Sequence, residues 1–76
     1  MQYFTSILDA RHQVNLSQKK LSEKTGIDRA DISKIERGLL NPSLRILNRL
    51  AAGMGMQLDI RYVLADREEP NDGNIE

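Results

Sequence analysis

The fold is decided by residues 16–38, which read LSQKKLSEKTGIDRADISKIERG. Ser17 is a preferred N-cap residue, and residues 18–25 after it predict a short helix whose main apolar residue is Leu21. Gly26 ends that helix, because glycine readily takes the left-handed conformation found at helix C-termini. The first half of the stretch is therefore one capped helix of about two turns.

The second half of the stretch predicts another short helix. Asp28 is an N-cap candidate, residues 29–37 continue without a helix breaker, and Gly38 ends the run. Two short helices joined tightly through a glycine are typical of a helix-turn-helix arrangement, in which the second helix enters the major groove of DNA.

Helices are also predicted on both sides of this pair. Residues 5–14 place apolar and long side chains at three- and four-residue steps, and Asn15 suits a left-handed C-cap. Pro42 and Ser43 open a fourth helix that continues to about residue 52. Its apolar stripe consists of Leu44, Leu47, Leu50 and Ala51, and we expect Gly53 and Gly55 to end it.

Beyond these glycines the apolar period changes from helical to two. Apolar side chains occupy every second position from Met56 to Leu64, which predicts a half-buried strand. The fold class is therefore all-α, with four helices and one C-terminal strand. A lone strand leaves its backbone groups unpaired. The same segment of a second copy, with Leu58, Ile60 and Tyr62 packed on the helices, is one partner, and residues 2–4 of the same chain are the alternative.

Composition indicates a small intracellular chain. Its 76 residues suffice for one domain, and the absence of cysteine excludes disulfides and zinc-thiolate sites. We divide the chain into a helical domain at 1–55, the dimer strand at 56–64 and a flexible acidic tail at 65–76. No leader or membrane span is recognisable, so we expect a cytoplasmic protein.

The net charge of zero conceals a basic segment. Residues 11–37 hold seven Lys or Arg against four acids, whereas residues 66–76 hold one Arg against five acids. The basic segment contains the predicted helix 29–37, whose polar arc spans about 140° opposite Ile32 and Ile35. That arc carries Arg29, Ala30, Ser33, Lys34 and Arg37. Such a face is often merely solvated, but these residue types also suit base edges and phosphates.

Many fixed positions match one family. The chain has Arg11, then Leu16-Ser17-Gln18, Leu21, Gly26-Ile27, Ile32-Ser33, Ile35-Glu36, Gly38, Asn41-Pro42-Ser43-Leu44, Leu47 and Leu50-Ala51. It resembles the phage-repressor-like helix-turn-helix regulators of Cro/C1 or xenobiotic-response-element type over residues 4–54. Ser22 stands where the family commonly has Ala, and the strand 56–64 replaces the family's frequent fifth helix.

The resemblance implies roles for individual residues. It implies that Arg29, Ala30, Ser33 and Lys34 face DNA bases, and that Ser17, Gln18 and Arg37 contact the DNA backbone. It also implies an ion pair between Arg11 and Glu36 that clamps the first helix onto the third. The expected function is that of a homodimeric repressor of a palindromic operator on double-stranded DNA, without a cofactor.

A second hypothesis fits the same features. The chain also looks like antitoxins of type II toxin-antitoxin pairs, which bind a toxin and repress their own operon; the acidic tail or the strand edge would then hold the toxin. An enzyme is not expected, because His12 is the only histidine and no phosphate loop or metal-ligand cluster is present. Membrane binding is not expected either, since the basic helices lack a large aromatic face.

Overall fold

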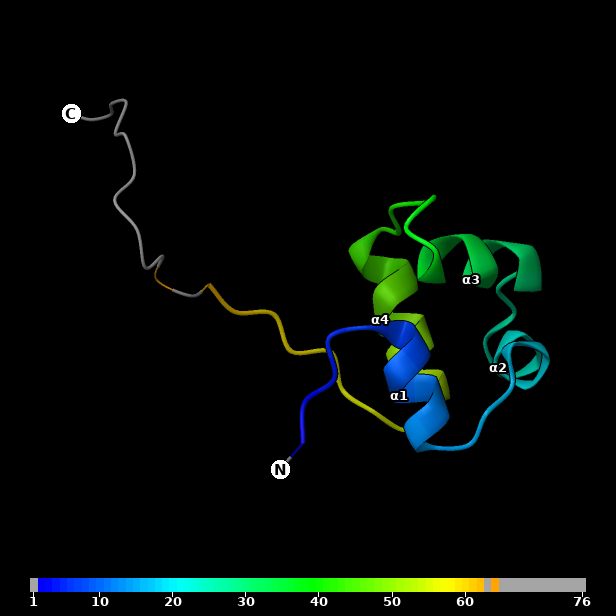
Figure 1. Cartoon of the computed structure of the whole chain (residues 1–76), viewed down its shortest axis with the longest axis horizontal. Helices are drawn as coiled ribbons and strands as arrows, with labels where there is room; N and C mark the ends of the chain where they lie inside the picture. Colours follow the sequence, from blue (N-terminus) through cyan, green and yellow to red (C-terminus); the bar gives the residue numbers. More distant parts are fainter. Residues whose placement is uncertain (1, 63, 65–76) are drawn as a thin grey trace.

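A computed structural model describes residues 2–62 and 64 of the chain. Four helices form its body: α1 (Ile7–Gln13), α2 (Gln18–Thr25), α3 (Arg29–Glu36) and α4 (Leu44–Gly53). In Figure 1, α1 lies in front of α4, and α3 lies above α2. The fold class is all-α, as the sequence predicts.

Serine hydroxyls start three of the helices. The Oγ atoms of Ser6, Ser17 and Ser43 accept hydrogen bonds from the backbone N–H groups of Asp9, Lys20 and Ile46, at 3.1, 3.0 and 3.2 Å. Each bond satisfies a donor that the first helical turn leaves without a partner. The sequence predicted a start at residue 5 for α1, but the cap at Ser6 delays the helix to Ile7.

Helix α3 starts differently. Asp28 occupies its N-cap position, as predicted, but its side chain makes no capping hydrogen bond. The turn that leads to α3 is fixed from the other side, because the Ser22 hydroxyl donates a 2.6 Å hydrogen bond to the carbonyl of Ile27. Gly26 in that turn has φ +76°, the left-handed conformation that glycine permits. The turn between α2 and α3 is therefore held by α2 itself.

One apolar cluster joins all four helices and the turn. Its buried members are Ala10, Leu21, Ile27, Ile32, Leu50 and Met54. Leu21, Ile32 and Leu50 are the largest fully buried side chains, and burying such a side chain stabilises a fold by about 1.5–3 kcal/mol. They come from α2, α3 and α4, so the core fixes α3 against its two neighbours.

Helices α2 and α4 approach closely at Gly53. A Cβ atom at that position would lie 2.5 Å from Cγ2 of Thr25 and 3.1 Å from Cδ1 of Leu21. Gly53 is the last residue of α4, in agreement with the prediction that it ends the helix. Its lack of a side chain also permits the close contact between α2 and α4.

The predicted strand does not form within the chain. The described residues 56–62 and 64 belong to no strand, and neither do residues 2–4. The alternative of pairing between these two segments is therefore wrong, although they run near each other after leaving the helical body on the same side (Figure 1). Pairing between two copies stays a prediction, and the predicted tail at 65–76 lies outside the described residues.

Candidate nucleic-acid interface

Helix α3 separates an apolar side from a polar side. Ile32 is fully buried and Ile35 half-buried, and both pack on the rest of the fold. On the other side Arg29, Ala30 and Lys34 are exposed, and Ser33 is half-buried. The four residues expected to face DNA bases thus lie together on the outer side of one rigidly packed helix.

The nearest acid on α3 lies away from that side. Asp31 is half-buried and lines a small hollow together with Ile27, Ile35 and the 40–43 loop. Asp31 is therefore on the flank of α3 that borders this loop.

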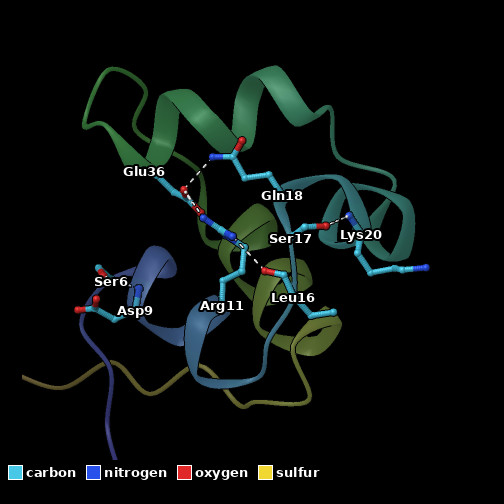
Figure 2. A network of polar contacts seen from close by, with 8 residues as sticks. All are labelled: Ser6, Asp9, Arg11, Leu16, Ser17, Gln18, Lys20 and Glu36. Atoms are coloured by element: carbon cyan, nitrogen blue, oxygen red, sulfur yellow. Dashed lines mark hydrogen bonds and ion pairs between the residues drawn. The ribbon is translucent and has the colours of Figure 1, made fainter.

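An ion pair ties α1 to the end of α3. Nε and Nη2 of Arg11 donate hydrogen bonds to Oε2 and Oε1 of Glu36, at 2.8 and 3.1 Å (Figure 2). Nη1 of Arg11 donates a third bond, 3.0 Å long, to the carbonyl of Leu16. Only 9% of the Arg11 side chain and 5% of the Glu36 side chain are exposed. The bidentate geometry is the strongest arrangement that arginine and a carboxylate form.

Gln18 extends this pair to the start of α2. Its Nε2 donates a 2.9 Å hydrogen bond to Oε1 of Glu36, as Figure 2 shows. The resemblance assigned Gln18 to the DNA backbone and gave no hint of this contact. A primary amide has two N–H donors, so one N–H remains for a phosphate while the other holds Glu36. Gln18 therefore connects the α2 N-terminus, the α1 arginine and the α3 carboxylate.

The carboxyl of Glu36 is kept ionised by these donors. Burial by itself raises the pKa of Glu36, but the hydrogen bonds from Arg11 and Gln18 and the charge of Arg11 outweigh burial. The pKa of Glu36 therefore lies below its ordinary value of 4.5. Near neutral pH the pair stays fully charged, and α3 keeps its attachment to α1 and α2.

A second arginine braces the helix pair from α4. Nη2 of Arg49 donates a 2.6 Å hydrogen bond to the carbonyl of Thr25, the last residue of α2. A cation at a helix C-terminus also interacts favourably with the helix dipole. Sequence reasoning missed this contact, since the two residues lie 24 positions apart and neither stands out in the pattern.

Exposed basic residues outnumber exposed acidic residues over residues 17–37. Apart from Arg29 and Lys34, exposed cations on or beside α2, α3 and α4 are Lys19, Lys20, Lys24, Arg37, Arg45 and Arg49. Lys20 faces Glu23 at 3.6 Å, but both side chains are more than half exposed, so the pair is weak. An excess of exposed basic residues favours a polyanionic partner.

Within residues 2–62 and 64, no group of three His, Asp or Glu side chains is arranged to hold a metal ion. No helix in this part of the chain has the length and apolar character to cross a bilayer.

The chain is similar to known helix-turn-helix proteins. The family model described as helix-turn-helix matches residues 7–60. An uncharacterised HTH-type transcriptional regulator of Mycobacterium tuberculosis is 30% identical over 66 residues, which are 87% of this chain and 47% of that protein. A regulator of the same description from Haemophilus influenzae is 37% identical over 54 residues, 71% of this chain and 55% of the relative.

Archaeal proteins are similar as well. An uncharacterised HTH-type transcriptional regulator of Archaeoglobus fulgidus is 30% identical over 64 residues, 84% of this chain and 91% of the relative. The chain spans about half the length of the bacterial relatives above. No solved structure matches it. The match over residues 7–60 includes all four helices and both partners of the Arg11–Glu36 pair, and the chain belongs to the Cro/C1-type helix-turn-helix family.

Proposed function

We propose that the chain is a sequence-specific DNA-binding transcriptional regulator that reads the major groove through α3. The observation that carries the proposal is the outward side of α3, where Arg29, Ala30, Ser33 and Lys34 stand opposite the buried Ile32. Arginine and lysine pair with guanine edges, serine contacts several base edges, and alanine packs on a thymine methyl group. One helix face thus offers the chemistry needed to distinguish base pairs.

The neighbouring groups would position α3 in the groove. Arg37 is exposed at the C-cap of α3, and Gln18 and Ser17 stand at the N-terminus of α2. Exposed N–H groups at a helix N-terminus attract phosphate, and phosphate contacts fix the register of a protein on DNA without reading sequence. Because Gln18 also holds Glu36, a phosphate bound there would be linked directly to the position of α3.

The active form in this proposal is a homodimer. Two reading helices about 34 Å apart would meet successive major grooves on one side of a palindromic site, and two sets of contacts multiply the discrimination of one. A dimer that covers a promoter excludes other proteins from it, so repression needs no further surface. Such a regulator acts where the DNA is, and we expect it in the cytoplasm.

The antitoxin hypothesis remains a second prediction. The acidic tail to which it assigns toxin binding lies outside the described residues, so no contact in the structure favours it over the repressor. The antitoxin hypothesis would be supported by an adjacent gene whose product is a small basic protein that co-purifies with this chain.

A selection from random duplex DNA tests the proposal. The full chain is incubated with a random pool at moderate salt, and bound duplexes are sequenced over several rounds. We expect an inverted repeat whose half-sites are about one helical turn apart, centre to centre. The variant Lys34→Ala should lose preference at one position of each half-site. Lys24→Ala is the control, because Lys24 lies on α2 beside Gly53 of α4, where a Cβ on Gly53 would be 3.9 Å from the Cβ of Lys24. This control should select the wild-type motif. No enrichment by the wild type would refute the proposal.

A further inference from the structure

The segment that follows α4 changes character along its length. Met56 packs on the helical core and is half-buried, and Leu58 is half-buried as well. Further along, Ile60, Tyr62 and Leu64 are 60%, 103% and 95% exposed. These five side chains occupy alternate positions, which in an extended segment share one side. The second half of that apolar side is therefore uncovered within one chain.

A groove lies beside this segment. Residues 56–59 and Arg61 form one wall, residues 2–7 form another, and Ala10, Leu47, Leu50, Ala51 and Met54 of α1, α4 and its C-cap form the floor. Arg61 also reaches the opposite wall, since its guanidinium lies 5.0 Å from the ring centroid of Tyr3. The described backbone of both walls belongs to no strand, so the edge of the 56–62 segment is open to another chain.

The polar side of the segment carries two opposite charges. Asp59 and Arg61 form an ion pair between Oδ2 and Nη2, which places the two side chains on the same side of the backbone. Both are substantially exposed, at 45% and 59% of the side chain. A segment with one acid and one base at i and i+2 is complementary to a copy of itself running in the opposite direction.

We propose that residues 56–64 of two copies pair as an antiparallel ribbon whose two-fold axis passes between the two Ile60 residues. This inference rests on the dimer proposed above and specifies its register. In this register Asp59 faces the partner's Arg61, and Arg61 faces the partner's Asp59. On the other side Leu58 faces the partner's Tyr62, and Met56 faces the partner's Leu64. In this register the Ile60–Ile60, Leu58–Tyr62 and Met56–Leu64 pairs are apolar and the two Asp59–Arg61 pairs are oppositely charged, while Gln57 faces the partner's Val63.

Neighbouring registers lack this match. A shift of the pairing by one residue places apolar side chains opposite polar ones, because it exchanges the two sides of one strand. A shift by two residues centres the axis on Asp59 or on Arg61 and places identical charges opposite each other, which destabilises a cross-strand pair. The charge pattern thus selects the register centred on Ile60.

The same register covers the exposed apolar groups. Leu58 lines the groove, so the partner's Tyr62, which lies opposite Leu58, would be placed beside the groove. The fully exposed ring of Tyr62 then gains apolar neighbours in the other copy. Each chain supplies the side chain that fills its partner's groove.

Single cysteines test the register, because the chain contains none of its own. In the proposed ribbon two cysteines at position 60 have Cβ atoms about 4.5–5.5 Å apart, close enough for a disulfide. Leu58→Cys and Tyr62→Cys are the controls. In the proposed ribbon the cysteine of each control lies about 14 Å from the same cysteine of the partner, because the two positions are four residues apart along the strand. We expect the full chain with Ile60→Cys to cross-link nearly completely under mild oxidation, each control alone to stay uncross-linked, and the double control variant to cross-link.

A charge exchange gives an independent readout. Asp59→Arg alone and Arg61→Asp alone each place like charges opposite each other twice, and we expect each to weaken self-association by about tenfold. An equimolar mixture of the two variants restores both opposite pairs and should form a heterodimer with near wild-type affinity by analytical ultracentrifugation.

The possible failures are distinguishable. A dimer that cross-links through Leu58→Cys or Tyr62→Cys instead of Ile60→Cys overturns the register and leaves the dimer intact. A wild-type chain that sediments as a monomer at high micromolar concentration and on operator DNA overturns the proposed dimer itself. A mixture of charge variants that associates no better than either variant alone also overturns the register.

Discussion

Removing the charge of Glu36 should destabilise the fold far more than removing an exposed carboxylate. The substitution Glu36→Gln keeps the size of the side chain but leaves the Arg11 guanidinium, in a residue only 7% exposed, without a counter-ion. Breaking one partner of a buried pair costs about 3–5 kcal/mol. A domain of this length has a free energy of unfolding of about 4–11 kcal/mol, at about 0.05–0.15 kcal/mol per residue. We therefore expect the variant to lose about a quarter or more of its stability.

The assay is urea denaturation at neutral pH followed by far-ultraviolet circular dichroism. Glu23→Gln is the matched control, because it breaks an exposed 3.6 Å pair with Lys20 and should cost about 0–1 kcal/mol. The double variant Arg11→Met with Glu36→Leu removes both charges, and we expect it to lie closer to the wild type than Glu36→Gln does. Equal losses for Glu36→Gln and Glu23→Gln, or a double variant as unstable as the summed single changes, would refute the assigned role of the pair.

Three further predictions follow from the contacts of the helices. The folded-state pKa of Glu36 is depressed, so the contribution of Glu36 to stability is present above pH 4.5 and is lost as the pH falls through the folded pKa. The urea midpoints of the wild type and of Glu36→Gln should therefore converge in acid. A difference between the two midpoints that stays constant from pH 7 to pH 3 would contradict this. Gly53→Ala should lower the free energy of unfolding by about 1–3 kcal/mol despite the better helix propensity of alanine, because the new Cβ would lie 2.5 Å from Cγ2 of Thr25. Thr25→Ser in the same chain removes that methyl group and should restore part of the loss. A Gly53→Ala variant as stable as the wild type would disprove the close approach of α2 and α4. Arg37→Ala should weaken binding to all duplexes alike and reduce the slope of log affinity against log salt by about one per protomer, and an unchanged slope would remove Arg37 from the DNA backbone.

The local elements could be predicted because their signals are local. The bounds of α2 follow from a hydroxyl at Ser17 and a left-handed Gly26, which lie directly at its two ends. The start of α1 was predicted two residues early, since Thr5 and Ser6 are both possible caps and only the hydroxyl of Ser6 accepts a hydrogen bond from the backbone of Asp9. A helix end is thus predictable where the sequence offers one capping residue, and it is uncertain by one or two residues where two neighbouring residues could cap.

The contacts that position α3 were predictable only in part. The Arg11–Glu36 pair was implied by the family resemblance, whereas the bonds from Gln18 to Glu36 and from Arg49 to Thr25 were not anticipated. They join residues 18 and 24 positions apart, and their existence depends on how the helices pack. The periodicity of residues 56–64 predicted a strand, but a strand needs a second edge to pair with, and the described residues of the chain supply none.

The most direct test of the account is the ratio of affinities for the selected operator and for a random duplex, measured by fluorescence anisotropy at fixed salt with Lys34→Ala and Lys24→Ala. The account predicts that Lys34→Ala weakens operator binding by at least about tenfold while binding to the random duplex changes much less, since a base contact is worth about 1–3 kcal/mol. Lys24→Ala should leave the ratio unchanged. An equal loss on both duplexes for Lys34→Ala would contradict the claim that the outward side of α3 reads sequence.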